Sequence, residues 1–263
     1  MTQLARQPER AEGRVSGTKS ISRAFAVLNA FREAPGDLGV VEVAEQLGLT
    51  LSTAHRIARA LVLEGYLAQE VGRERYRLGP QALLLGQAAQ RALGMDLVRP
   101  VLRRLADHTG ESVNLGLLDG DHAVVVQRVE SNQPLRFSME IGDRIELHAT
   151  SMGKSLLAFN DGLSAYVDSL AADLPRLTAK THPTVDSLRT DLAQIARQGW
   201  SIDDEESMVG VRCVAAPVKD GAGQARAAVA IQAPAVRMPD ERLAELGPKV
   251  RDAALALTGL LPI

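Results

Sequence analysis

The sequence predicts an α+β protein with two domains, an N-terminal winged helix-turn-helix and a C-terminal domain built on a mostly antiparallel sheet. Three observations predict this fold class. Two runs of helically spaced apolar residues flank a glycine within residues 40–65, the apolar period shortens from about 3.6 to about 2 after residue 110, and glycine turns separate the extended runs. A chain of 263 residues is long enough for two domains that each bury a core.

The charge of the chain is unevenly distributed. Hydrophobic residues make up 46% and charged residues 24%, as in folded globular proteins, and the formal net charge of −2 by itself argues against a nucleic-acid binder. Residues 1–91, however, hold 12 Lys or Arg against 9 Asp or Glu, a net +3, whereas the remainder holds 18 against 23, a net −5. This asymmetry has the sign expected of a DNA-binding domain attached to an acidic body.

Several classes of protein are excluded by what the sequence lacks. Cys213 is the single cysteine, which excludes an intrachain disulfide framework and a cysteine-based zinc cluster. Residues 1–17 form a polar leader, expected to be disordered, and no run of about 18 apolar residues occurs in the chain. We therefore expect a soluble cytoplasmic protein with no membrane partner.

The first expected helix leads into the helix-turn-helix. Ser20 is placed to cap it, and it ends near Ala34-Pro35-Gly36. The apolar side that supports the next two helices consists of Ile21, Ala24, Phe25, Leu28 and Phe31. A helix over Val40–Leu47 then stops at Gly48, and Thr50 is a suitable N-cap for a second helix that ends at Gly65.

The outer face of this second helix predicts a major-groove contact. Arginine can donate two hydrogen bonds to guanine, serine and threonine can reach a base or a phosphate, and free N–H groups at a helix start attract phosphate oxygens. The residues expected to contact DNA from this helix are Thr50, Ser52, Thr53, His55, Arg56 and Arg59. The alternative is an amphipathic helical hairpin whose arginines are merely solvated.

A basic hairpin favours DNA binding over that alternative. Tyr66 to Leu78 predicts a strand, a turn at Val71-Gly72-Arg73 and a second strand. The hairpin would place Arg73, Arg75 and Arg77 beside the second helix. Helices followed by a basic hairpin make a winged helix-turn-helix over residues 18–79, for which double-stranded operator DNA is the expected partner.

Residues 80–94 are interpreted as a linker helix. Gly79-Pro80 opens the helix and Gly94 ends it. Its apolar residues, Leu83, Leu84, Leu85, Ala88 and Ala92, cover more than one face. Such a helix is expected to contact both its own domain and a second copy of the chain, which makes a homo-oligomer the expected assembly.

Residues 95–263 predict the α+β domain. Asp96 is a candidate cap for a helix that ends at Gly110. The expected extended runs are 112–118 and 123–129 around Asp119-Gly120-Asp121, 135–139 and 144–147 around Ile141-Gly142-Asp143, and 213–218 and 225–233 around Asp220-Gly221-Ala222-Gly223. The expected helices follow Thr150, span 184–198 and close the chain over 239–261.

Three stretches of this domain are candidates for chemistry. Residues 150–154 start a helix, where unpaired N–H groups favour an anion, although an ordinary capped helix is the commoner explanation of such residues. His148 stands where a phosphate loop needs glycine, which excludes that motif. Residues 203–206 are acidic, as in a solvated loop. Cys213 could be a nucleophile, but it lies in a strand with no adjacent base, and buried structural cysteines are commoner.

Motifs along the chain resemble the IclR family of bacterial transcriptional regulators. They are Ser20-Ile21-Ser22-Arg23-Ala24, Ser52-Thr53-Ala54-His55-Arg56, Tyr76-Arg77-Leu78-Gly79, Leu147-His148-Ala149-Thr150, Gly153-Lys154 and Gly210-Val211-Arg212-Cys213. The resemblance covers Lys19 to Leu261. It implies a GAF-like effector domain after the linker helix. It also implies a homodimer that binds a pseudo-palindromic operator, and two such dimers often pair into a tetramer.

The resemblance also implies an effector pocket. The positions that match it are Phe137, Ile145, Thr150, Ser151, Met152, Asp203, Val211, Cys213, Ala230 and Gln232. Asp203 would accept a hydrogen bond from an effector hydroxyl, a protonated carboxyl or an N–H group. Ala230 and Gln232 replace hydroxyl-bearing residues of well-known members, which favours a larger, partly apolar acid; Arg136 or Arg144 could pair with its carboxylate, though surface positions are expected for both.

The resulting hypothesis is a transcriptional regulator whose operator affinity changes when a small organic acid binds. No cofactor and no metal are expected, because the five histidines are scattered without ligand spacing. One alternative is a hydrolase or transferase with a regulatory helix-turn-helix, and another is an architectural DNA-binding protein without an effector. The sequence leaves open repression versus activation, and dimer versus tetramer.

Overall fold

The computed structural model describes residues 18–69, 72–137, 139–170 and 174–262. The chain divides into two compact units, Met1–Ala89 and Gln90–Ile263. The division falls within the expected linker helix, which is formed as α4 (Pro80–Ala92). The expected leader, Val71 of the expected wing turn and Ser138 of the expected run 135–139 lie outside the described residues.

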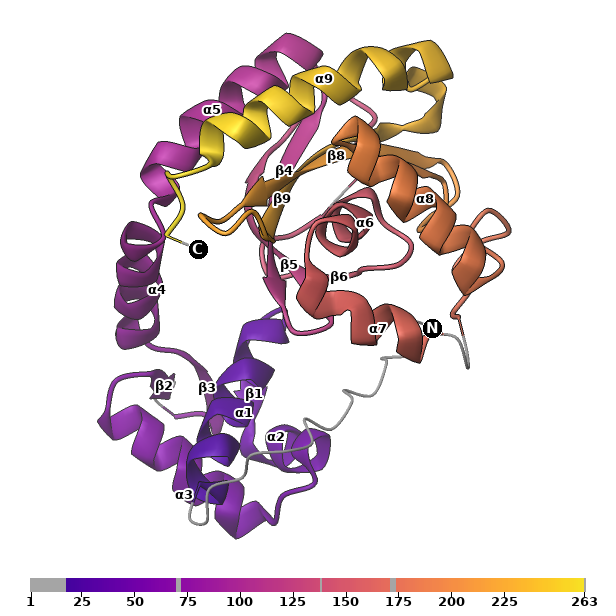
Figure 1. Ribbon diagram of the computed structural model, residues 1–263. Helices are drawn as coiled ribbons and strands as arrows, with labels where there is room; N and C mark the ends of the chain where they lie inside the picture. Colours follow the sequence, from indigo (N-terminus) through magenta and orange to yellow (C-terminus); the bar gives the residue numbers. More distant parts are fainter. Residues whose placement is uncertain (1–17, 70–71, 138, 171–173, 263) are drawn as a thin grey trace. The chain divides into compact units, whose positions relative to one another are not determined.

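The N-terminal unit is a winged helix-turn-helix, as predicted (Figure 1). Its helices are α1 (Lys19–Glu33), α2 (Val40–Leu47) and α3 (Leu51–Leu63). Its strands β1 (Leu38–Gly39), β2 (Leu67–Gln69) and β3 (Arg75–Leu78) form an antiparallel sheet in the order β1-β3-β2. The two-residue strand β1 was not predicted, since it is too short to show an apolar period.

Local signals set the turn between α2 and α3. Gly48 adopts the left-handed conformation with φ +60°, which costs glycine little and other residues more. Thr50 then caps α3 by accepting a hydrogen bond from the Thr53 N–H at 3.3 Å, as expected. The expected cap of α1 was wrong by two residues, because Thr18 rather than Ser20 precedes its first turn.

The C-terminal unit is built on a six-stranded sheet in which all neighbouring strands are antiparallel, in the order β6-β5-β4-β9-β8-β7. The strands are β4 (Ser112–Asp119), β5 (His122–Val129), β6 (Arg144–Glu146), β7 (Ser201–Asp204), β8 (Val211–Lys219) and β9 (Ala225–Pro234). The two expected hairpins are confirmed as β4–β5 and β8–β9.

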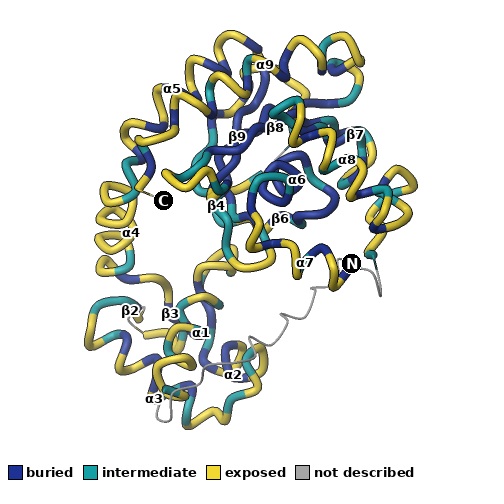
Figure 2. Tube along the Cα trace, in the orientation of Figure 1, coloured by how far each residue is buried: buried dark blue, intermediate teal, exposed yellow. Residues whose placement is uncertain are grey.

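Helices cover both faces of this sheet (Figure 1). On one face, α5 (Met95–Thr109) and α9 (Asp240–Leu257) pack over one apolar core. On the other face, α6 (Ser151–Ala158), α7 (Ser164–Ser169) and α8 (Val185–Gln198) pack over a second core. Short 3-10 helices lie at Asp161–Leu163 and Ala235–Arg237. Strands β8 and β9 and helix α6 are accordingly the most deeply buried elements of the unit (Figure 2).

Several local expectations for this unit were wrong. Gly94 rather than Asp96 occupies the N-cap of α5, and Asp96 lies in its first turn. The described residues of 135–139 form no strand, because this segment is bound by Arg128, whose Nη2 donates to the Phe137 carbonyl at 2.7 Å. The acidic run at 203–206 is not a solvated loop, since Asp203 lies on β7 and is 1% exposed. Within the described chain, no helix is both long and apolar enough to cross a bilayer.

Replacing Gly153 with alanine should destabilise the C-terminal unit. A Cβ at Gly153 would meet the Leu147 backbone at 2.3 to 2.6 Å, and backbone atoms cannot move aside as a side chain can. We expect Gly153→Ala to lower the free energy of unfolding by about 1–3 kcal/mol or more. The measurement is urea unfolding followed by tryptophan fluorescence, which reports on this unit because Trp200 is the only tryptophan of the chain.

Gly221→Ala is the matched control, since its Cβ would meet nothing within 4 Å and its φ lies outside the left-handed region. That variant should be as stable as the wild type or more stable, by about 0.4–1 kcal/mol. Equal stability of Gly153→Ala and the wild type would contradict the close packing of α6 on the Leu147 backbone.

Candidate functional site

Helix α3 presents a polar face opposite its buried one. Ser52, Arg56 and Arg59 are exposed and Thr53 and His55 are half-buried, while the opposite side is buried in the unit's core. The amphipathic pattern predicted for this helix is therefore confirmed. Two guanidinium groups on one exposed helical face can donate paired hydrogen bonds to guanine edges or bind phosphates.

The wing arginines differ in what they contact. Arg73 and Arg77 are exposed. Arg75 instead donates from Nε to Asp37 Oδ1 at 2.9 Å and from Nη2 to the Asp37 carbonyl at 2.8 Å, and its Nη1 lies 3.1 Å from Glu42 Oε2. Arg75 thus ties the wing to the segment before β1 and to α2, which leaves fewer of its donors for DNA than the sequence suggested.

The expected effector residues on β7, β8 and β9 lie on the sheet face that α6 covers. Asp203 is paired with Cys213, and Cys213 with Gln232, so these side chains form one row across three adjacent strands. Val211 and Ala230 lie two residues along β8 and β9 and therefore on the same face. Ile145 shares this face but lies on β6, at the opposite edge of the sheet from Asp203.

The start of α6 faces this row. Thr150 caps the helix by accepting the Gly153 N–H at 3.0 Å, and its hydroxyl donates to the Glu146 carbonyl at 2.7 Å. The amides of Ser151 and Met152 are in the first turn, where N–H groups have no intrahelical partner. Ser201 of β7 donates to the Ser151 carbonyl at 2.6 Å, which holds the first turn of α6 against the sheet.

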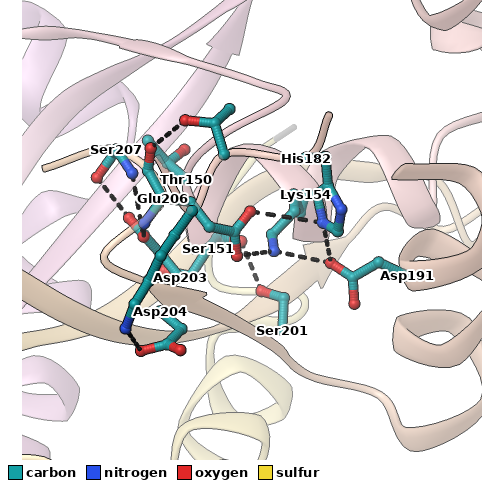
Figure 3. Close-up of polar contacts among 12 residues, drawn as sticks. Thr150, Ser151, Lys154, His182, Asp191, Ser201, Asp203, Asp204, Glu206 and Ser207 are labelled. Atoms are coloured by element: carbon teal, nitrogen blue, oxygen red, sulfur yellow. Dashed lines mark hydrogen bonds and ion pairs between the residues drawn. The ribbon is translucent and has the colours of Figure 1, made fainter. Parts of the chain in front are cut away.

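Asp203 is held by its own loop (Figure 3). One carboxylate oxygen accepts the N–H groups of Glu206 at 2.7 Å and Ser207 at 3.2 Å, and the other accepts the Ser207 hydroxyl. Burial raises the pKa of Asp203 to about 6, helped by the nearby charge of Glu206 and opposed by the Ser207 hydrogen bonds. The carboxylate that was expected to receive an effector therefore already has three donors.

Cys213 has the environment of an inert thiol. It is buried, and burial together with the charge of Asp203 raises its pKa well above the ordinary value. A nucleophilic cysteine requires a thiolate, which positive neighbours rather than a carboxylate would stabilise. The thiol instead contributes a small apolar surface beside the first turn of α6.

The sequence reasoning missed a buried charge network beneath α6. Lys154 is 1% exposed, and its ammonium group donates to Asp191 Oδ2 at 2.7 Å and to Glu206 Oε1 at 2.5 Å (Figure 3). His182 Nε2 lies 3.1 Å from Asp191 Oδ2 and 3.5 Å from Glu206 Oε2. Burial opposes the charge of Lys154, but the two carboxylates outweigh it and raise its pKa.

Three members of this network could in principle hold a metal ion. Ligand atoms of His182, Asp191 and Glu206 all lie within 4.8 Å of one another. The Lys154 ammonium, however, already contacts both carboxylates and supplies the positive charge between them. The cluster is therefore best described as an ion-pair network that joins α6, α8 and the loop after β7.

Two further polar residues of the same sheet face were missed. Asn114 on β4 and Arg128 on β5 are directly opposite each other, and Asn114 Nδ2 donates to Gln232 Oε1 at 3.4 Å. The arginines considered from the sequence are on the surface, as expected: Arg136 lies 3.5 Å from Glu130, and Arg144 lies 2.9 Å from Asp119. The alternation of polar and apolar residues along β4 and β5 could have suggested that Asn114 and Arg128 share a sheet face. Only the strand register shows that they lie beside Gln232.

Comparison with known proteins identifies both units. A model of the bacterial transcriptional regulator IclR C-terminal domain matches residues 88–258, and a model of the IclR helix-turn-helix domain matches residues 20–71. The chain is 35% identical over 248 residues to the HTH-type transcriptional regulator BhcR of Paracoccus denitrificans, a match that covers 94% of this chain and 88% of BhcR.

Solved structures share the fold. The crystal structure of Thermotoga maritima IclR matches with a TM-score of 0.73 and 28% identity, over 91% of this chain and 97% of that one. An IclR homolog from Microbacterium hydrocarbonoxydans, complexed with 4-hydroxybenzoate, matches with a TM-score of 0.78 and 21% identity, over 92% and 99% of the two chains. None of these matches supports the enzyme alternative.

Removing the Lys154 charge should destabilise the C-terminal unit strongly. Lys154→Met leaves the buried Glu206 and the half-buried Asp191 without their cation, and breaking a buried ion pair costs about 3–5 kcal/mol. The free energy of unfolding, measured in urea by Trp200 fluorescence, should fall by that amount. The control Lys249→Met removes an exposed pair with Glu245 and should cost less than about 1 kcal/mol; similar losses in the two variants would refute the role given to Lys154.

Proposed function

We propose that this chain, which belongs to the IclR family of bacterial transcriptional regulators, binds operator DNA with α3 and its wing and releases or tightens that contact when a small carboxylic acid binds beneath α6. The observation that carries the proposal is the first turn of α6: the Ser151 side chain interacts with Cys213, and Cys213 is paired with Gln232 on the neighbouring strand. N–H groups at a helix start attract a carboxylate.

The residues around this turn favour a small acid over a nucleotide or a metal complex. On the sheet, Cys213 and Ala230 have short side chains, Met152 of α6 is apolar, and the charged residues beneath α6 are already paired. A homolog with this fold was solved with 4-hydroxybenzoate, a carboxylic acid of the size proposed. The proposed effector contacts remain those expected from the sequence. Asp203 is the exception, because we propose that it only holds the loop of Glu206 and Ser207 in place.

For regulation, the acid must have different affinities for two arrangements of the DNA-binding units, typically with about 1–3 kcal/mol of coupling. We propose that α4 transmits the difference, because the division between the two units falls within it. Within the described chain no residue of α4 is buried, although Leu83, Leu84 and Leu85 are large and apolar. We propose that this helix contacts a second copy of the chain. We also propose that the protein is a cytoplasmic regulator and not an enzyme.

Arg56→Ala should weaken operator binding. Its guanidinium is exposed on the face of α3 opposite the core, and an arginine that reads guanine contributes about 1–3 kcal/mol. The loss should relax sequence preference at one base pair, measured by fluorescence anisotropy on a duplex selected from random DNA by the wild-type protein. The control Arg189→Ala removes an exposed arginine of α8 and should leave DNA affinity unchanged; an unchanged affinity for Arg56→Ala would remove Arg56 from the interface.

Ser151→Pro should abolish the effector response and preserve DNA binding. Proline is tolerated at the first position of a helix and removes the amide, and Thr150, with φ −114° and ψ 151°, already has the backbone that precedes proline well. The response is the change in operator anisotropy when keto, hydroxy and aromatic acids are added. The matched variant Ser151→Ala keeps the amide and should keep the response. A full response in Ser151→Pro would place the acid elsewhere.

A further inference from the structure

Each nitrogen atom of the Arg75 guanidinium has a partner within the N-terminal unit. Nε donates to Asp37 Oδ1 at 2.9 Å, Nη2 donates to the Asp37 carbonyl at 2.8 Å, and Nη1 lies 3.1 Å from Glu42 Oε2. A guanidinium that is bound twice by one residue and paired with a second carboxylate is held in one geometry. Arg75 therefore differs from a solvated arginine that is free to turn toward DNA.

The two acidic residues lie on segments that lead into the helix-turn-helix. Asp37 directly precedes β1, which pairs with β3 so that Gly39 is opposite Arg75. Glu42 is in the first turn of α2, and the oxygen that lies near Arg75 also accepts the Gly39 N–H at 2.5 Å. We call Asp37, Glu42 and Arg75 the wing anchor, because they join β3 of the wing to the start of α2.

Arg75 and Arg77 project from the same side of β3 but differ in their surroundings. They are two residues apart on the strand, and Tyr76 between them is buried in the core. Arg77 is exposed, whereas Arg75 is bound to carboxylates. A basic hairpin suggests one role for both arginines, and the contacts indicate two: Arg77 can reach a phosphate, and Arg75 holds the strand that carries Arg77.

We propose that Arg75 is a positioning residue for DNA binding, which its contacts with Asp37 and Glu42 fix against α2. The wing, strands β2 and β3, then lies where Arg77 contacts a DNA phosphate while α3 enters the major groove. The proposal rests on the proposed function, since it takes α3 and the wing to contact DNA. It implies that two carboxylates beside a DNA-binding surface increase the affinity for DNA.

Charge alone predicts the opposite effect. A carboxylate repels phosphates, so its removal should strengthen binding to DNA, and removal of the Asp37 side chain would also release Arg75 toward a phosphate. The wing anchor instead predicts weaker binding, because the wing loses its fixed position relative to α2. The sign of the change at Asp37 therefore distinguishes a positioning role of Arg75 from a direct phosphate contact.

The wing anchor orients the wing and contributes little to the stability of the fold. The side chains of Arg75, Asp37 and Glu42 are 38%, 37% and 46% exposed, and solvent-exposed ion pairs stabilise proteins only slightly. Apolar packing holds β1 on β3, since Leu38 and Tyr76 are paired and both lie in the core. Asp37→Ala should therefore leave the circular dichroism spectrum and the melting temperature of the full chain nearly unchanged.

The test measures DNA affinity of the full chain by fluorescence anisotropy, on a duplex selected from random DNA by the wild-type protein. Asp37→Ala should weaken binding about 10-fold, as for the loss of one charge-assisted hydrogen bond. The matched control is Glu45→Ala, which removes an exposed carboxylate from α2 outside the wing anchor. That control should leave the affinity unchanged or increase it.

A double-mutant cycle with Arg77→Gln assigns the loss to the wing. In the wild-type background, Arg77→Gln should lower the slope of log affinity against log salt concentration by about 0.9, the value for one phosphate contact. In the Asp37→Ala background, the same substitution should change the slope by less than a third of that amount, because the displaced wing has already lost the contact. Arg75 itself is present in both backgrounds, so its charge does not affect the comparison.

Each outcome decides the inference. Unchanged or tighter binding by Asp37→Ala, or an equal effect of Arg77→Gln in both backgrounds, would overturn it and leave the proposed function standing. If Arg77→Gln leaves the wild-type slope unchanged, the inference fails together with the proposed wing contact, while Arg56→Ala tests α3 separately. Should Asp37→Ala fail to fold, Arg75→Gln takes its place in the cycle: a positioning role predicts little further loss from Arg77→Gln, and a direct phosphate contact by Arg75 predicts additive losses.

Discussion

The C-terminal unit depends on one buried ammonium group. Lys154 projects from α6 and is held by Asp191 of α8 and by Glu206 after β7, so three segments distant in sequence meet at a single charge. Charges in a protein interior are tolerated only when they are paired and hydrogen-bonded. The position of α6 on the sheet, and of the loop that contains Asp203 and Ser207, is therefore fixed by electrostatics as well as by apolar packing.

A second constraint acts on the same helix. Gly153 lies so close to the Leu147 backbone that no side chain fits, and Met152 lies against Gly116 of β4. These contacts hold the first turn of α6 against the sheet, beside Gly116, Ser201 and Cys213.

Much of the fold could be predicted because its signals are local. The helix-turn-helix is encoded by helical apolar spacing, a left-handed glycine and a threonine cap, which lie close together in the sequence. The predicted bounds of its two helices were therefore nearly right. The hairpins β4–β5 and β8–β9 were found for the same reason, since their turns contain Gly120 and Gly223 with positive φ. Residues 135–139 were misjudged because an extended backbone can be bound by a side chain instead of a strand, and the local pattern is the same in both cases.

The sequence by itself determined the two-unit α+β fold, the polar face of α3 and the family. It did not reveal that Asp203 is hydrogen-bonded to its own loop, that Arg75 is hydrogen-bonded to Asp37, or that Lys154 is buried in a charge network. Only the tertiary structure decided these points. Strand register and ion pairing join residues far apart in the chain, such as Asn114 with Gln232 or Lys154 with Glu206, and no periodicity within one segment encodes such a contact.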